Sequence, residues 1–237
     1  MKTVVVGMSG GVDSSLSALL LKQQGFRVIG LFMKNWEEKG EDGMCKAAAD
    51  FIDVQRVCEQ ISIPCYHIQF VQEYWDLVFS SFLEGIRRGL TPNPDILCNQ
   101  EIKFQLFFQK AKAMGADCIA TGHYCQKKNV GEQALLLKGQ DPGKDQSYFL
   151  YTMQQDVLKE VLFPIGHLEK KEVRRLAAFH HLPTATKKDS TGICFIGKRN
   201  FADFLSHYVG IQPGTFQTLE GRIVGHHQGT AYYTIGQ

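Results

Sequence analysis

The 237-residue sequence lacks long hydrophobic runs. No apolar stretch approaches the roughly 20 residues that a membrane-spanning helix needs. The first residues, 1–7, lead directly into a strand-like pattern and lack the features of a cleaved signal peptide. We therefore expect a cytoplasmic protein without a membrane partner.

Paired cysteines are lacking as well. The chain has seven cysteines, an odd number, and no C-x-x-C pair. Without a secretion signal, an odd count argues against a disulfide framework, and the missing pair argues against a structural zinc site. Most of these thiols are expected to be small buried hydrophobic groups.

The net charge is only +2, but it is unevenly distributed. Residues 166–200 contain eight lysines and arginines against three acidic residues, a local balance of +5 that leaves −3 for the rest of the chain. Such a block indicates a surface that meets a polyanion. A solvated helix face would give the same pattern, so the charge alone leaves both interpretations open.

Apolar strands alternate with helices over the first two thirds of the chain. The helical spacing after the first strand ends at Gly25, a residue typical of a helix C-terminus. The alternation predicts βαβ units, right-handed crossovers and a parallel sheet covered on both faces. Strands are expected over residues 3–8, 28–33, 65–70 and 118–121, and helices over residues 47–60, 74–88 and a segment with Phe104, Phe107, Phe108 and Ala111 on one face.

The alternation fades from about Tyr148. Turn residues at 212–214 and 219–222 indicate short strands of a small appended domain. The sequence thus predicts one α/β domain over residues 1–165 and a second segment, with the small domain, over residues 166–237.

The glycine-rich stretch Ser-Gly-Gly-Val-Asp-Ser-Ser at residues 9–15 lies between the first strand and the first helix. Backbone N–H groups at a helix N-terminus carry partial positive charge, which suits phosphate oxygens. The glycines let the backbone approach such oxygens, and Asp13 could hold Mg²⁺. A capped turn would explain one polar residue but not the whole stretch. The G-x-G-x-x-G and Walker patterns are absent, which argues against a dinucleotide site and a P-loop kinase.

Two cysteines lie in conspicuous surroundings. Asn93 and Pro94 can open a helix that places Cys98 in its first turns, where the helix field lowers the pKa of a thiol. Asp95 would share a face with this thiol and could move a proton. Cys194 follows a glycine in a stretch flanked by lysines. Taken singly, each cysteine could also be a buried thiol or part of an ordinary loop.

The stretch Ser-Gly-Gly-Val-Asp-Ser resembles the loop of the PP-loop ATP pyrophosphatases. That resemblance implies a five-stranded parallel sheet of the adenine-nucleotide alpha-hydrolase-like type. It also implies that ATP, with Mg²⁺, is split between its α- and β-phosphates while a carbonyl oxygen is adenylated. The acceptor of the adenylyl group stays open at this point.

With the two cysteine stretches added, the chain resembles the tRNA-specific 2-thiouridylase family. Members of this family continue past the equivalent of Gly236 and Gln237 into a C-terminal β-barrel, which is expected to be absent from this chain, and this puts full tRNA binding in doubt. The matching blocks cover nearly the whole chain in the family order: residues 7–14, Asn93, Pro94 and Asp95 with Cys98, residues 120–124, residues 144–150 and residues 189–197.

The resemblance implies that residues 1–165 are the ATP-binding catalytic domain and that residues 166–237 are a central tRNA-binding and sulfur-carrier segment with the small domain. It also implies a role for each matching residue. Cys98 would be the catalytic nucleophile, assisted by Asp95, and Cys194 would carry the persulfide and form a transient disulfide with Cys98. The residues expected to bind ATP are Gly7, Met8, Ser9, Gly10, Gly11, Val12, Asp13, Ser14, Met33 and Gly122. The residues expected to contact tRNA are Asn93, Pro94, Asp95, His123, Lys144, Asp145 and Gln146.

The implied reaction replaces the 2-carbonyl oxygen of the wobble uridine of tRNA with sulfur. ATP adenylates the oxygen and releases pyrophosphate, a donor protein of unknown identity supplies a persulfide, and AMP leaves. Direct attack by the persulfide and attack by released hydrosulfide both stay open. The alternatives are another PP-loop ligase acting on a small-molecule carbonyl, which would need neither cysteine, and a non-catalytic nucleotide-binding or tRNA-binding module.

Overall fold

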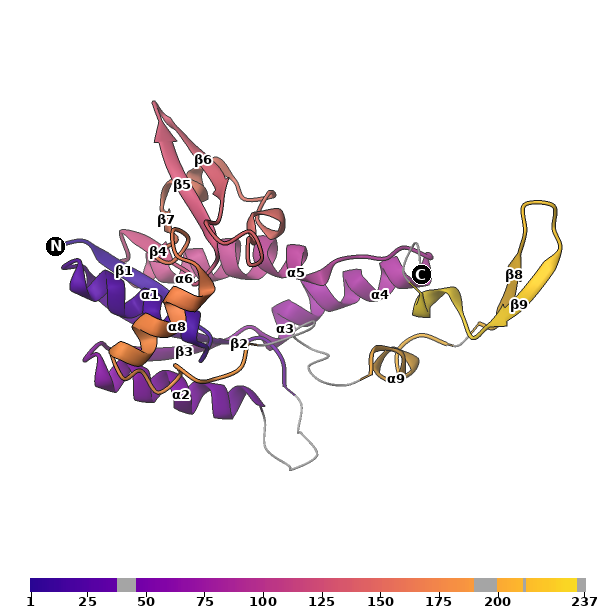
Figure 1. The fold of residues 1–237 in the computed structure, drawn as a ribbon, viewed down its shortest axis with the longest axis horizontal. Coiled ribbons are helices and arrows are strands. Elements are labelled where there is room, and N and C mark those ends of the chain that lie inside the picture. The colour runs from indigo at the N-terminus through magenta and orange to yellow at the C-terminus, as the bar shows by residue number, and fades with distance from the viewer. Residues whose placement is uncertain (38–45, 190–199, 211, 234–237) are drawn as a thin grey trace.

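A five-stranded parallel sheet forms the centre of the fold, in the order β3-β2-β1-β4-β7. The computed structural model describes residues 1–37, 46–189, 200–210 and 212–233 (Figure 1). The predicted parallel sheet is confirmed. Its short fifth strand, β7, was not located by the sequence pattern; it pairs with β4 and forms one outer edge of the sheet. The strands are β1 (Thr3–Met8), β2 (Arg27–Lys34), β3 (Cys65–Gln69), β4 (Cys118–Ala120) and β7 (Val161–Leu162).

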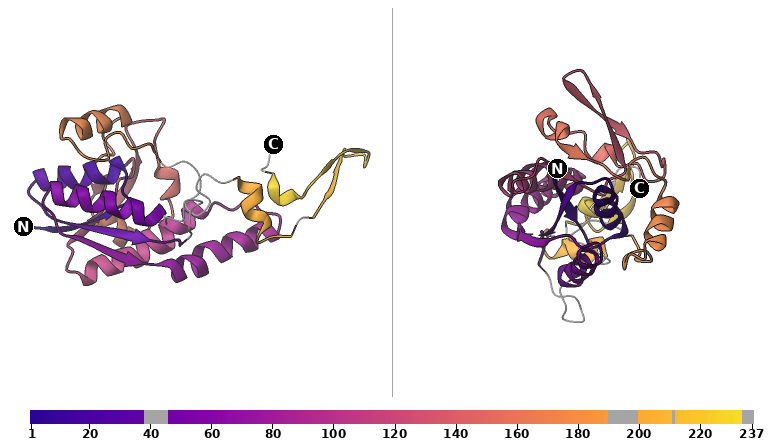
Figure 2. Two further views of the ribbon diagram at one scale, coloured as in Figure 1. Left: turned by 90° about the horizontal axis from the view of Figure 1, so that it is seen from below. Right: turned by 90° about the vertical axis from the view of Figure 1, so that its left-hand side faces the viewer.

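Helices cover both faces of this sheet (Figure 2). Successive side chains of a strand point to opposite faces. Val4 and Val6 therefore pack in one core cluster, while Val5 packs in the other. The first face carries α1 (Val12–Gln23), α2 (Lys46–Gln60) and α8 (Lys170–Phe179); the second carries α3 (Val71–Tyr74), η1 (Trp75–Phe79), α4 (Ser80–Arg87), α5 (Pro94–Leu97), η2 (Cys98–Leu106) and α6 (Phe107–Ala113).

Two of the expected helices contain π-helical turns. Residues 71–87 form α3, η1 and α4 in succession, and residues 94–113 form α5, η2 and α6, where η1 and η2 are π-helical. Phe104, Phe107 and Ala111 are buried, as their shared face predicts. The π-turns were not predicted because apolar residues three and four apart also fit an α-helix.

An antiparallel hairpin, which the sequence pattern did not predict, projects from the body of the molecule (Figure 1). It consists of β5 (Cys125–Val130) and β6 (Gln133–Lys138), and is followed by η3 (Ser147–Phe149) and α7 (Gln155–Lys159). The Gln155 side chain bonds to both backbone groups of Ala134, at 3.0 and 2.8 Å, and so ties the hairpin to α7.

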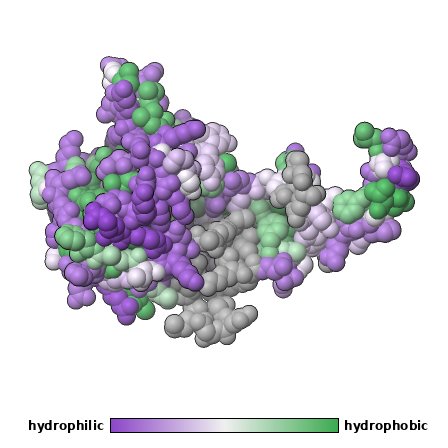
Figure 3. All heavy atoms as spheres, viewed as in Figure 1, coloured by the Kyte–Doolittle hydropathy of each residue, from purple (hydrophilic) through white to green (hydrophobic). Residues whose placement is uncertain are grey.

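The C-terminal part extends away from the sheet (Figures 1 and 2). It contains α9 (Phe201–Ser206), the hairpin of β8 (Gly214–Gln217) and β9 (Ile223–His227), and η4 (Thr230–Tyr232). The short strands predicted here are confirmed. The hairpin exposes hydrophobic side chains (green in Figure 3), among them Phe216, Ile223 and Val224.

The division of the chain at residues 165 and 166 stays a prediction. Beyond that point, α8 packs against α1 through Val173 and Ala177. Within the described ranges, no helix combines the length and the apolar character needed to cross a membrane.

Candidate active site

The loop between β1 and α1 leaves the start of the helix open. Gly11 is the N-cap of α1, and no side chain caps the helix there. The Ser14 and Ser15 hydroxyls instead turn back to the Gly11 carbonyl, at 3.2 and 2.8 Å. The first-turn N–H groups of α1 are thus available to an anion, and the helix dipole favours one.

Glycine is required at two positions around this loop. Gly10 has φ +76, and a Cβ built there would lie 2.6 Å from the Asp50 carbonyl oxygen. At Gly122, just past β4, a Cβ would lie 2.8 Å from the backbone of Asp13 and Ser14. The end of β4 therefore abuts the loop so closely that only glycine fits.

The other residues expected to bind ATP differ in what they can offer. Met8 and Val12 are buried in the core, so only their backbone can face a nucleotide. Ser9 accepts from the Gly11 amide at 3.3 Å and shares a hydrogen bond with the Ser14 hydroxyl at 3.1 Å. Gly7 belongs to β1, and Met33, near the carboxyl end of β2, is partly buried against the core.

Asp13 is bound on both oxygens. Lys170 of α8 donates to Oδ1 and Oδ2, each at 2.8 Å, and the Tyr124 hydroxyl donates to Oδ1 at 2.7 Å. Burial and the neighbouring Asp13 carboxylate raise the pKa of Tyr124, so its hydroxyl keeps its proton and serves as a donor. Asp13 could meet Mg²⁺ only by exchanging one of these contacts.

Lys170 joins Asp13 to a second carboxylate, that of Asp189. Its Nζ lies 2.9 Å from Asp189 Oδ1, and Asp189 also pairs with Arg174 at 2.6 Å and with Lys144 at 3.0 Å. Burial alone would raise the pKa of Asp189, but the hydrogen bonds from Lys170 and Lys144 outweigh it and lower that pKa. A single charge network thus links the glycine loop, α8 and the 144–146 segment.

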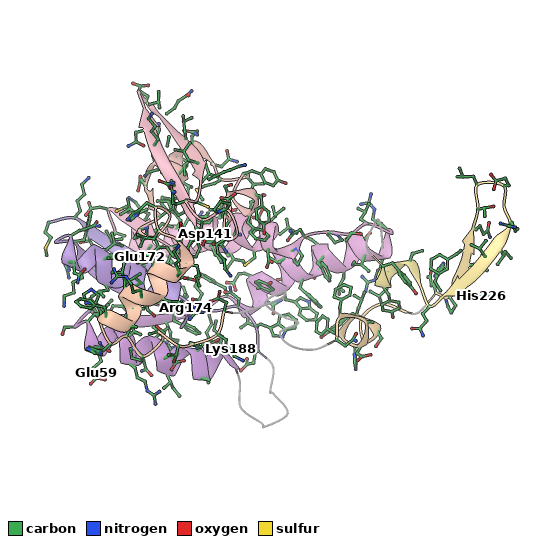
Figure 4. All side chains as sticks on the ribbon, viewed as in Figure 1. Glu59, Asp141, Glu172, Arg174, Lys188 and His226 are labelled. Atoms are coloured by element: carbon green, nitrogen blue, oxygen red, sulfur yellow. The ribbon has the colours of Figure 1, made fainter. Side chains whose placement is uncertain are left out.

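This network changes the interpretation of the basic block. Arg174, labelled on α8 in Figure 4, also donates to the carbonyls of Ala185 and Lys187 at 3.0 Å, so its donors are engaged within the chain. Lys187 pairs with Asp50 and Asp53, both at 2.7 Å. Much of the local excess charge is therefore neutralised within the chain, and the exposed cations of α8 are Lys171 and Arg175.

The helix that carries Cys98 begins as predicted. Asn93 is the N-cap and accepts from the Asp95 amide at 3.0 Å, and Pro94 is the first helical residue. Cys98 continues this helix as the first residue of η2, where its side chain is buried, 5% exposed. Burial raises the pKa of Asp95, with a smaller opposing effect of Lys103.

His123 lies between the glycine loop and η2. It follows Gly122, its Nδ1 is 2.8 Å from the Thr121 hydroxyl, and its ring centroid is 5.9 Å from that of Phe104 in η2. Burial, followed by the charge of Lys103, holds the pKa of His123 well below its usual value, so the ring is neutral. The residues that follow β4 thus contact both the glycine loop and η2, at the carboxyl ends of the parallel strands.

The three residues expected at 144–146 hold their own loop together. Lys144 pairs with Asp189, as described above. Asp145 accepts from the Gly139 amide at 2.9 Å and from the Ser147 amide and hydroxyl at 3.2 and 2.9 Å, and these bonds outweigh burial and lower its pKa. Gln146 accepts from the Tyr124 amide at 3.0 Å. Contact of these side chains with RNA stays a prediction.

Sequence reasoning missed three members of the network and leaves one predicted residue outside the structure. In the sequence, Tyr124 belongs to the matching block 120–124, Lys170 to the basic block 166–200, and Asp189 to the start of the stretch that contains Cys194. None of these positions predicts that the three side chains meet. Their pairing joins residues up to 157 positions apart, for which a sequence gives no local signal. Cys194 lies outside the described residues. Within those residues, no cluster of three or more histidine, cysteine or acidic side chains could hold a metal.

The five-stranded parallel sheet and the open start of α1 define an α/β domain with the PP-loop fold. The chain belongs to the family described as tRNA methyl transferase HUP domain, whose model matches residues 2–198. A second model, tRNA methyl transferase PRC-barrel domain, matches residues 202–237.

Similar proteins carry the name tRNA-specific 2-thiouridylase MnmA. The protein of Protochlamydia amoebophila is 62% identical over 237 residues, which is 100% of this chain and 63% of the relative. The proteins of Halalkalibacterium halodurans and Oceanobacillus iheyensis are 58% and 57% identical, over 99% of this chain and 63% of each relative. The chain thus spans somewhat less than two thirds of the length of these relatives.

Solved structures share the fold at low sequence identity. A 4-thiouridine synthetase in complex with RNA and ATP has a TM-score of 0.53 and 15% identity, over 87% of this chain and 50% of that one. The glutamine-dependent NAD+ synthetase of Acinetobacter baumannii has a TM-score of 0.50 and 13% identity, over 79% of this chain and 32% of that one. These likenesses confirm the predicted fold class.

Proposed function

We propose that the protein is an ATP-dependent sulfurtransferase that 2-thiolates the wobble uridine of tRNA. The observation that carries this proposal is the meeting of the glycine loop with the Cys98 helix at the end of β4, through Gly122 and His123. A small-molecule PP-loop ligase would not need a cysteine helix next to its nucleotide loop. The name shared by the 57–62% identical relatives supports the same function.

The first half-reaction is adenylation of the uridine. The first-turn amides of α1, with the Ser9 and Ser14 hydroxyls, hold the phosphates and stabilise the charge that develops on departing pyrophosphate. The 2-carbonyl oxygen attacks the α-phosphorus of ATP, and the bond to the β-phosphate breaks. Mg²⁺ would add charge stabilisation there, and Asp13 would supply a carboxylate ligand if it exchanged a contact with Lys170 or Tyr124.

The second half-reaction replaces the activated oxygen with sulfur. In one route the terminal sulfur of a Cys194 persulfide attacks C2 of the uridine and expels AMP; the Cys98 thiolate then attacks the Cys194 sulfur, which releases the thiouridine and forms a Cys98–Cys194 disulfide. In the other, the Cys98 thiolate attacks the Cys194 sulfur, which releases hydrosulfide and forms the disulfide; hydrosulfide then attacks C2 and expels AMP. In both routes two equivalents of an external thiol reduce the disulfide and are themselves oxidised to a disulfide. Asp95, with its raised pKa, is suited to hold a proton near Cys98.

The partners follow from this chemistry. The target base must leave its stack to reach a site at a sheet edge, which costs little in a single-stranded anticodon loop. Asn93, Pro94 and Asp95 would surround this base, next to Cys98. A donor protein would load the persulfide, and the tRNA substrate implies a cytoplasmic reaction.

The test is mass spectrometry of the products after incubation of the chain with ATP, unmodified tRNA and a persulfide donor. We expect AMP, pyrophosphate and a uridine in which sulfur has replaced oxygen. A methylated nucleoside in a parallel reaction that is also supplied with a methyl donor, which the family description would suggest, would overturn the proposal. AMP without modified RNA would favour a small-molecule acceptor, and no turnover, with nucleotide or tRNA binding intact, would favour the non-catalytic module.

A further inference from the structure

Two exposed tyrosines follow the segment 144–146. Tyr148 is 58% exposed and Tyr151 is 69% exposed, whereas Phe149 packs against the core and Leu150 is buried in it. The segment thus turns two aromatic rings toward solvent and two apolar side chains toward the core. The Tyr148 ring contacts the Phe149 ring, with centroids 4.0 Å apart. The remaining surface of the Tyr148 ring and the Tyr151 ring are exposed and available to a ligand.

The backbone beneath these rings is held in place relative to Cys98. Asn99, the next residue along η2, is buried, and its Nδ2 donates to the Phe149 carbonyl at 3.5 Å. On the other side, Asp145 and Gln146 anchor the loop through the backbone of Gly139 and Tyr124. The backbone that carries the two rings is therefore held against η2, the segment that begins at Cys98.

A cleft with a volume of about 530 Å³ adjoins the same segment. Apolar side chains and carboxamides line it, and among its described lining residues there is no lysine or arginine, while Asp156 is acidic. Such a lining disfavours phosphate and suits a neutral planar group that forms hydrogen bonds along its edge. The lining includes Phe104, Phe108, Leu150, Met153, Gln105 and Gln154.

The polar residues expected to contact tRNA are already engaged. Asp145, Gln146 and Lys144 make the intrachain contacts described above, and His123 is buried. Tyr148 and Tyr151, in contrast, are exposed in the same segment. Stacking is open to any base, because every base has a π-face.

We propose that Tyr148 and Tyr151 form a stacking platform for unpaired bases next to the target uridine, with the cleft as the seat of one such base. The proposal rests on the proposed function for its ligand, an RNA strand. The platform would hold one nucleotide while the site formed by Asn93, Pro94 and Asp95 holds its neighbour, the target uridine. Holding both at once would fix the position of the RNA loop relative to Cys98.

The test measures binding of an anticodon stem-loop RNA that carries 2-aminopurine beside the target uridine. Tyr148→Ala and Tyr151→Ala should each weaken binding about tenfold, and the 2-aminopurine fluorescence quenched by stacking should recover. Tyr148→Phe and Tyr151→Phe should restore both signals, because they keep the ring. Tyr66→Ala removes a similarly exposed tyrosine from the opposite sheet edge, on β3, and should change neither.

Further arms separate this proposal from the function on which it rests. An abasic nucleotide at the 2-aminopurine position should make wild type and Tyr148→Ala bind equally. Wild-type affinity in the double alanine variant would overturn the platform even if thiolation proceeds. Tyrosine-dependent RNA binding without thiolation would uphold the platform and sink the enzymatic proposal. Saturable binding of adenosine alone, with no RNA binding, would show a nucleoside site and overturn the RNA platform.

Discussion

At the scale of single residues, Cys98 is the group on which the proposed chemistry depends most. Cys98→Ser changes the volume of a buried side chain very little, so the fold and ATP binding should persist. A serine hydroxyl is far too basic to replace the thiolate, and thiolated tRNA should fall at least about 10³-fold. The measurement is thiouridine content by mass spectrometry.

Cys118→Ser is the matched control. This half-buried thiol lies at the start of β4, away from the edge where Gly122 and His123 follow the strand, and its loss should leave turnover intact. Turnover near the wild-type level in Cys98→Ser would remove Cys98 from the mechanism.

Asp189 is the residue whose contribution should depend on pH. Its pKa is lowered in the folded state, so its stabilising effect is present above the unfolded-state value of about 4 and is lost as the pH falls through the folded value. Asp189→Asn should lower the free energy of unfolding by about 1–3 kcal/mol at neutral pH. The deficit should shrink as the pH falls below about 4. Denaturant titrations across this range measure it.

An exposed ion pair on α8 is the control for Asp189→Asn. Glu172→Gln breaks the Glu172–Arg175 pair, which lies at the surface of α8, and should change stability little. An Asp189→Asn variant whose deficit does not vary with pH would show that packing, rather than the three cations, explains the effect.

At the scale of elements, the loop between β1 and α1 depends on its backbone. Gly10→Ala meets both a left-handed φ and a Cβ placed 2.6 Å from the Asp50 carbonyl oxygen. Because the clash is with backbone, the loop must shift, at a cost of about 2 kcal/mol or more. We expect ATP binding to be lost in isothermal titration calorimetry.

Gly25→Ala isolates the effect of φ. Gly25, at the C-terminus of α1, has φ +84, but a Cβ there meets nothing within 4 Å. It should cost only about 1 kcal/mol and leave ATP binding unchanged. Equal losses of affinity in the two variants would mean that the loop does not shape the nucleotide site.

The elements also show what a sequence can and cannot predict. The strands β1 to β4, the Asn93–Pro94 helix start and the Gly25 helix end were predictable, because each depends on residues close together in the chain. The Lys170–Asp13 contact was not, because it joins α8 to α1 across 157 positions. The buried, neutral state of His123 was also hidden, since it depends on packing against Phe104.

At the scale of the whole molecule, the distribution of charge decides how RNA could approach. The sequence suggested one basic block, but the structure pairs Lys170, Arg174 and Lys187 with acids of the same chain. Substituting Arg174 together with Lys171 and Arg175 would therefore disturb the fold as well as the surface. Lys171 and Arg175, 83% and 65% exposed, are the cations of α8 that test the surface alone.

The double variant Lys171→Gln, Arg175→Gln should keep wild-type stability and ATP binding, because both partners of each pair lie at the surface. If α8 faces tRNA, the variant neutralises fewer phosphates, so its binding releases fewer counterions from the RNA. The slope of log affinity against log salt should then flatten by roughly 1–2. The control variant combines Lys110→Gln with Lys112→Gln. Both lysines lie on α6, across the sheet, so the control removes the same charge and should leave the slope unchanged.

An equal change of slope in both variants would mean that net charge, not the exposed face of α8, governs tRNA binding. An unchanged slope in the α8 variant would return Lys171 and Arg175 to an ordinary solvated helix face.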